Sequence, residues 1–130
     1  MAKSESAHRC YLSLGSNCAM RKRKIEEALQ ELESRFGEIN YSDIYDTDSV
    51  SGDGSCYKNC VVECSLNEPY EVILRETKEI EARAGRDRES RRRGVVPLDI
   101  DVVIWDGEIV RPKDYSYEYF QQGYRKLRDK

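Results

Sequence analysis

Two aspartates occupy alternate positions in the hydrophobic segment LDIDVVIW at residues 98–105. Side chains alternate between the two faces of a strand, so Asp99 and Asp101 (the acid pair) should point to the same face, with their Cα atoms roughly 7 Å apart. Two carboxylates this close raise each other's pKa, and a divalent cation relieves the repulsion. Magnesium suits the pair because it binds one or two carboxylates and completes its shell with water and phosphate oxygens. The alternative is two solvated surface acids balanced by arginines.

A cluster of arginines lies just before this segment. Guanidinium groups bind phosphate through paired hydrogen bonds, so arginines beside the acid pair favour a site in which phosphate oxygens are held from two sides. The alternative is a solvated loop whose arginines balance neighbouring acids. The cluster comprises six arginines within residues 83–93: Arg83, Arg86, Arg88, Arg91, Arg92 and Arg93.

Hydrophobic periodicity predicts the elements that position these residues. Four segments have the alternation or the residue types of strands: residues 10–14, 39–45, 57–66 and 97–105. Two segments have apolar residues at helical spacing and end at a glycine: residues 21–36, and a second helix that starts at the Asn67-Glu68-Pro69 signal and runs to about residue 84. Asn67 is the candidate cap of the second helix. Residues 46–55 and 86–96 are expected to be loops, and no element is assigned from residue 112 onward.

The predicted order is β-α-β-β-α-β, and the Asp106-Gly107 turn signal adds a hairpin strand at residues 108–111. This order is typical of the α+β ferredoxin-like fold, an antiparallel sheet with both helices on one face. Leu98, Ile100 and Val102 should then face the helices. The acid pair should lie on the open face of the sheet.

Composition limits the classes of protein and site. The 130 residues suit a disordered tail at residues 1–9 and a single domain at residues 10–130. The net charge of −3 disfavours a general nucleic-acid binder. The five cysteines form no CxxC pair and the one histidine is His8, so a closed zinc site is not expected. No apolar run is long enough for a membrane span or a signal peptide, which favours a cytoplasmic protein.

Three stretches of the sequence carry a more specific signal than any single motif. They are YLSLGSN near the start, YKNCVVE in the third predicted strand, and the segment from IEARAGRDR to LDIDVVIWDGEIV. Through them, residues 10–111 resemble the 6-hydroxymethyl-7,8-dihydropterin pyrophosphokinase family of folate biosynthesis. The resemblance implies a ferredoxin-like fold and transfer of the pyrophosphoryl group of ATP to a pterin hydroxymethyl group, with two Mg²⁺ ions. ATP and a pterin are the expected ligands of a monomer or weak homodimer, with no nucleic-acid or membrane partner.

Positions that match the family motifs receive roles from this resemblance. The expected magnesium ligands are Asp99 and Asp101. The expected pterin contacts are Thr47, Tyr57 and Asn59, with Tyr124 as part of an aromatic wall around the pterin. The expected nucleotide contacts are Glu81, Arg86, Arg88 and Arg92. Catalysis is assigned to the acid pair together with Arg86 and Arg88.

The sequence departs from the family pattern at several positions. Arg93 stands where the pattern has an aromatic pterin contact, and Val96 stands where it has a phosphate-binding arginine. The prolines of the loop near Thr47 and a later P-H-P segment are absent. Three functions are therefore compared: an active pyrophosphokinase, a diverged relative that only binds a nucleotide or uses another acceptor, and an RNA-binding ferredoxin-like module. The last is disfavoured because Glu63 and the acid pair would repel phosphate on the open face.

Overall fold

The computed structural model describes residues 8–129 and contains one open antiparallel sheet. Its strands are β1 (His8–Ser16), β2 (Ile39–Tyr41), β3 (Tyr45–Asp48), β4 (Cys56–Leu66), β5 (Asp99–Trp105) and β6 (Glu108–Ile109). The helices are α1 (Arg21–Phe36), α2 (Tyr70–Arg83), α3 (Arg88–Arg92), α4 (Pro112–Ser116) and α5 (Glu118–Arg128). The strand order is β2-β4-β1-β5-β6, and β3 also pairs with β4.

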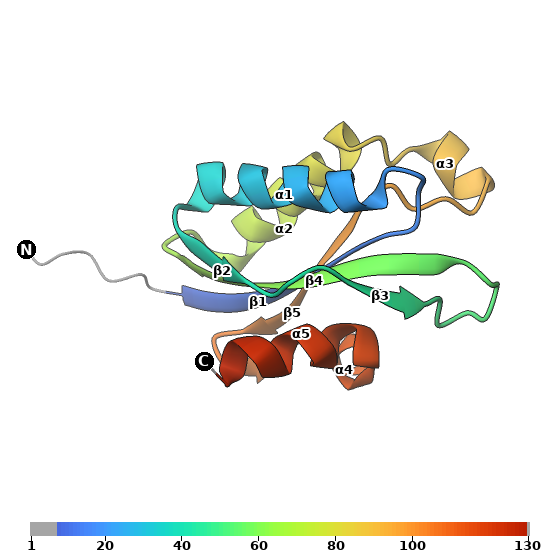
Figure 1. Cartoon of the computed structure of the whole chain (residues 1–130). Helices are drawn as coiled ribbons and strands as arrows, with labels where there is room; N and C mark the ends of the chain where they lie inside the picture. Colours follow the sequence, from blue (N-terminus) through green and yellow to red (C-terminus); the bar gives the residue numbers. More distant parts are fainter. Residues whose placement is uncertain (1–7, 130) are drawn as a thin grey trace, which may run out of the picture.

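The helices α1 and α2 cover one face of this sheet (Figure 1). Their apolar stripes face the alternate strand residues that the sequence predicts to point inward. This packing produces the larger hydrophobic core and confirms the expected faces of both helices and of β5. Its fully buried members include Leu12, Leu14, Ile25, Leu32, Cys60, Val62, Ile73 and Leu98.

The opposite face is only partly open, because α4 and α5 cover it (Figure 1). A second core forms there between α5 and the outward residues of β4 and β5, with Phe120 fully buried against Val61 and Val103. The expectation of helices on one face therefore holds for α1 and α2 but is incomplete. The chain is a mixed α/β protein whose site must lie on the part of the second face that α4 and α5 leave exposed.

The single strand predicted at residues 39–45 is wrong in extent: it covers β2 and only the first residue of β3, which continues to Asp48 within the predicted loop at residues 46–55. Ser42 lies between β2 and β3, where its hydroxyl accepts a hydrogen bond from the backbone N–H of Val61 at 3.0 Å. The side chain thereby replaces the main-chain acceptor that a continuous strand would present. The hydrogen-bonded ladder with β4 is interrupted here, and pairing with β4 resumes at Tyr45, where β3 begins.

The predicted basic loop at residues 86–96 contains the short helix α3. Asp87 caps it: its carboxylate accepts from the N–H of Ser90 at 2.8 Å, and the Ser90 hydroxyl accepts from the N–H of Asp87 at 3.0 Å. This reciprocal pair satisfies two backbone donors that a helix start leaves unpaired. The other predicted cap, Asn67, is wrong in position, because α2 begins at Tyr70 with Pro69 as its N-cap.

Two residues of the expected N-terminal tail belong to the sheet. Residues 1–7 lie outside the described part of the chain, but His8 and Arg9 belong to β1. Asp106, in the turn after β5, accepts a hydrogen bond from the N–H of Arg9 at 2.9 Å and lies 2.8 Å from Nδ1 of His8. Asp106 and Gly107 have φ angles of 51° and 82°, as the predicted Asp-Gly hairpin turn requires. Within residues 8–129, no helix is both long and apolar enough to cross a membrane.

Candidate active site

A pocket lies on the second face of the sheet, between the ends of the central strands, the loop after β3 and the start of α5. It brings together Thr47, Tyr57 and Asn59, the three expected pterin contacts, with Asp99 of the acid pair. These residues come from β3, β4 and β5, so only the folded sheet assembles them. The remaining lining residues are Ser13, Gly15, Asp48, Ser49, Val50 and Tyr119.

Gly15 of β1 occupies the floor of this pocket. It pairs with Asn59 on one side and with Asp99 on the other. A Cβ atom at Gly15 would lie 3.1 Å from Oδ1 of Asn59, so glycine leaves room for the amide. The almost fully buried Asn59 donates through Nδ2 to the Thr47 hydroxyl at 2.5 Å. The amide and hydroxyl are thus held in one orientation toward the pocket.

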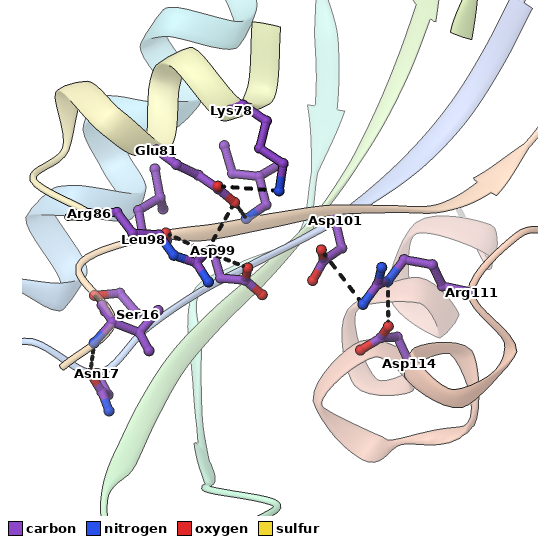
Figure 2. A network of polar contacts seen from close by, with 12 residues as sticks. Ser16, Asn17, Lys78, Glu81, Arg86, Leu98, Asp99, Asp101, Arg111 and Asp114 are labelled. Carbon is purple, nitrogen blue, oxygen red and sulfur yellow. Dashed lines mark hydrogen bonds and ion pairs between the residues drawn. The ribbon is translucent and has the colours of Figure 1, made fainter. Parts of the chain in front are cut away.

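Asp99 and Asp101 point to the same face, as the alternation predicts. Their side chains are 38% and 21% exposed, so solvent and small ligands can reach both. Each carboxylate faces an arginine (Figure 2). Asp99 accepts from Nη1 of Arg86 at 2.7 Å, and Oδ1 of Asp101 lies 3.8 Å from Nη2 of Arg111.

Burial, a hydrogen bond with Asp99 and the negative charge of Asp99 together raise the pKa of Asp101 to about 8. Arg111 opposes the shift. Asp101 therefore tends to hold a proton in the absence of a cation. This is the behaviour expected of two close carboxyl groups whose negative charges lack a full counter-charge.

Glu81 lies on the helix side of the sheet and contacts the neighbours of the acid pair. Its side chain is only 6% exposed, and its Oε2 accepts from the N–H of Ile100 at 2.7 Å. The same oxygen lies 3.2 Å from Nη1 of Arg86, which also binds Asp99 (Figure 2). Burial raises the pKa of Glu81. Glu81 does not line the pocket, and its contacts position Arg86 and the start of β5.

The other expected phosphate contacts lie on α3, apart from the pocket lining. Arg88 begins this helix, and Arg92 binds both carboxylate oxygens of Glu89 at 2.7 Å. Arg93 is the C-cap of the helix and also pairs with Glu89, at 3.8 Å. These side chains are exposed and would need to turn toward a ligand bound at the acid pair.

The LGSN motif explains how α3 is tied to the sheet. Oδ1 of Asn17 accepts from the N–H of Val96 at 2.6 Å, and its Nδ2 donates to the carbonyl of Gly94 at 3.3 Å. The backbone N–H of Asn17 donates to the carbonyl of Val96 at 3.0 Å. Asn17 therefore fixes the segment after α3 against the end of β1, next to the pocket floor.

The aromatic wall of the pocket is Tyr119, whereas the sequence analysis expected Tyr124. The ring of Tyr124 packs instead against Phe120 and Tyr11 in the second core, because it projects inward from α5. Sequence reasoning also missed Arg111 and Asp114. The apolar and aromatic residues at 119, 120, 124 and 127 have helical spacing, and this signal could have identified α5.

The donor set suits Mg²⁺ bound together with a phosphate ligand. Among the described residues, no group of three or more His, Cys, Asp or Glu side chains could hold a metal ion. The acid pair alone would leave most coordination positions to other oxygens, which is the usual arrangement for Mg²⁺ and substrate phosphates. Asp99 and Asp101 are therefore the residues that would hold such an ion.

The chain is similar to a known protein family. A family model described as 7,8-dihydro-6-hydroxymethylpterin-pyrophosphokinase (HPPK) matches residues 11–126. The match includes the pocket floor, the acid pair, α3 and nearly all of the C-terminal helical layer. The chain therefore belongs to the 7,8-dihydro-6-hydroxymethylpterin-pyrophosphokinase family.

Proposed function

We propose that this protein transfers the pyrophosphoryl group of ATP to 6-hydroxymethyl-7,8-dihydropterin in a Mg²⁺-dependent step of folate biosynthesis. One observation carries the proposal: a single pocket joins Thr47, Tyr57 and Asn59 to Asp99. Polar groups suited to a heterocycle thus lie directly beside a carboxylate suited to a phosphate-bound cation.

The acceptor would lie in the pocket itself. The Asn59 amide and the Thr47 hydroxyl can exchange hydrogen bonds with the polar edge of a pterin, while the rings of Tyr57 and Tyr119 border its flat surfaces. The hydroxymethyl oxygen would then point toward the acid pair. No side chain near the pocket is assigned as a general base.

ATP would bind across the acid pair and α3. Magnesium held by Asp99 and Asp101 would neutralise charge on the phosphates. Arg86, already placed by Glu81, would bind phosphate oxygens together with Arg88 and Arg92. The acceptor hydroxyl loses its proton to water and its oxygen bonds to the β-phosphorus as the bond from that phosphorus to the AMP oxygen breaks, and AMP leaves. Positioning and charge stabilisation supply most of the rate in reactions of this class.

A second candidate is a diverged relative that binds ATP but uses another acceptor or none. Arg93 favours it, because this residue is exposed at the end of α3 and brings no aromatic ring to the pocket. Tyr119 supports the first candidate, since it provides an aromatic wall from a different element. For either candidate we propose a ferredoxin-like domain that acts in the cytoplasm, without nucleic-acid or membrane partners, as a monomer or weak homodimer.

Formation of AMP from ATP and the reduced hydroxymethylpterin tests the proposal. The wild-type protein should form AMP only with Mg²⁺, and Asp101→Asn should lower the rate at least about 100-fold through lost charge stabilisation. Asp43→Asn is the matched control, because Asp43 is an exposed aspartate that pairs with Lys126. Binding of Mg²⁺ and a non-hydrolysable ATP analogue without AMP formation would favour the second candidate.

A further inference from the structure

The guanidinium group of Arg111 lies between two acidic side chains beside the pocket. Its Nε donates to Oδ2 of Asp114 at 2.5 Å, and its Nη2 lies 3.8 Å from Oδ1 of Asp101 (Figure 2). The contact with Asp114 is a short charge-assisted hydrogen bond, whereas the contact with Asp101 is a looser ion pair. Arg111 can therefore release Asp101 while it keeps Asp114.

Asp114 also contacts the aromatic wall of the pocket. Its Oδ1 accepts a hydrogen bond from the hydroxyl of Tyr119. The backbone carbonyl of Tyr119 accepts from the Tyr45 hydroxyl at 2.5 Å, so this residue is held at both ends. A continuous polar chain thus runs from Asp101 through Arg111 and Asp114 to Tyr119.

We propose that Arg111 is a built-in counter-cation of Asp101 that a bound divalent cation replaces, and that Asp114 transmits this replacement to Tyr119. The inference rests on the proposed function, because it takes the acid pair as the cation site. A divalent ion and a guanidinium group at the same carboxylate repel each other. Arg111 then binds Asp114 alone, and the hydrogen bond from Tyr119 adjusts to the changed acceptor.

Arg111 and Asp114 are positioning residues in this scheme. They connect the cation site to the pocket wall without contacting either substrate. Such coupling is reciprocal, so a ligand that packs against Tyr119 must change the cation affinity by the same factor by which the cation changes the ligand affinity. The acid pair and the pocket would then fill in a coupled manner.

Binding of Mn²⁺ to the full chain, measured from the EPR signal of the free ion, tests the first step. Arg111→Gln should raise the affinity about three- to tenfold, because the ion no longer displaces a positive charge from a partly exposed pair. Arg111→Lys keeps the charge and should stay within about twofold of wild type. Arg125→Gln is the matched control: Arg125 is 46% exposed, against 49% for Arg111, and pairs with Glu118 on α5.

The ¹⁹F spectrum of protein labelled with 3-fluorotyrosine tests the second step. The signal of Tyr119 is identified by its loss in Tyr119→Phe. Saturating Mg²⁺ should shift this signal in wild type and in Arg125→Gln. The shift should fall by more than half in Arg111→Gln and in Asp114→Ala, because each variant breaks the polar chain at a different residue.

The outcomes separate this inference from the proposed function. Equal or weaker Mn²⁺ binding by Arg111→Gln would overturn the inference alone and leave the cation site intact. A Tyr119 signal that does not respond to saturating Mg²⁺ in wild type would overturn the transmission step. Absence of Mn²⁺ binding in wild type would overturn both the inference and the cation site of the proposed function.

Discussion

At the scale of single residues, Asp101 of the acid pair combines solvent access with a raised pKa. Asp99 has the short contact with the arginine Arg86, whereas the arginine beside Asp101, Arg111, forms a looser ion pair, and Asp101 is the more buried of the two aspartates. Asp101 therefore bears more of the cost of charge in the protein without a cation. The same imbalance favours a divalent ion, because it supplies the missing positive charge.

This imbalance predicts a pH dependence of stability in metal-free buffer. The folded pKa of Asp101, about 8, lies above the ordinary value of 3.8, so the folded state binds more protons between these values than the unfolded state. The stabilisation from this proton is complete below the ordinary value and is lost as the pH rises toward 8. Asp101→Asn should remove this contribution.

The measurement is the free energy of unfolding by urea at several values between pH 5 and pH 8. As the pH rises, the free energy of unfolding of Asp101→Asn should increase relative to that of wild type. Asp43→Asn should keep the wild-type slope. If wild type and Asp101→Asn show parallel curves, Asp101 does not carry the proton.

At the scale of elements, two connections bring the site residues together. Asn17 joins the end of β1 to the segment after α3, and this contact determines where the arginines of α3 can reach. On the other side, α5 lies against β4 closely enough that Gly123 has no room for a side chain. Both connections link segments that are distant in sequence.

Asn17→Ala should loosen the segment after α3 without unfolding the protein. The variant loses the two side-chain hydrogen bonds of Asn17, to Gly94 and to Val96. The stabilisation lost with them should make local opening of this segment about tenfold more frequent. Amide hydrogen exchange should therefore accelerate at Val96. Asn40→Ala removes an exposed asparagine contact with Glu63 and serves as the control. Unchanged exchange at Val96 would contradict this role of Asn17.

Gly123→Ala should separate α5 from the sheet. The added Cβ atom would lie 2.7 Å from Cγ2 of Val61 and 2.9 Å from the Tyr45 hydroxyl. Overpacking typically costs about 1–3 kcal/mol, which meets or exceeds the gain of about 1 kcal/mol from replacing glycine by alanine in a helix. We expect a net loss of stability in urea unfolding and weaker pterin binding, since Tyr119 lies on the same helix.

The matched control for this prediction is Arg125→Ala, an alanine substitution at an exposed position of α5. It should change the free energy of unfolding little. Equal stability of Gly123→Ala and Arg125→Ala would show that α5 can move away from Val61 at no cost.

At the scale of the whole molecule, one sheet separates two hydrophobic cores. The larger core lies beneath α1 and α2, and the smaller one lies beneath α5. The pocket is on the side of the smaller core. Tyr119 immediately precedes Phe120, the largest fully buried residue of that core. Packing of the second core and the shape of the pocket therefore depend on each other.

Phe120→Ala should destabilise the entire protein if the two cores unfold together. Truncation of a buried phenylalanine costs about 3–5 kcal/mol. Urea unfolding should show this loss as a single transition. Leu74→Ala is the control, because Leu74 is partly exposed on α2 and its truncation should have a small effect. A separate early transition in Phe120→Ala would indicate that the C-terminal layer unfolds independently.

The sequence by itself determined those features that depend on local periodicity. The alternation in LDIDVV places Asp99 and Asp101 on the same face, because successive strand residues point in opposite directions. The helical spacing of residues 21–36 identifies α1 with its observed bounds. The motif residues Thr47, Tyr57 and Asn59, inferred from the family resemblance, line one pocket, and their contact with a pterin stays a prediction.

Only the tertiary structure decided which residues complete the site. Tyr119 rather than Tyr124 reaches the pocket, since the rotation of α5 is set by the close approach of Gly123 to Val61. Arg111 meets Asp101 because the chain reverses at the turn after β5. Glu81 supports Arg86 from the far side of β5. These contacts join residues whose relative placement depends on how helices pack on the sheet, which no local pattern encodes.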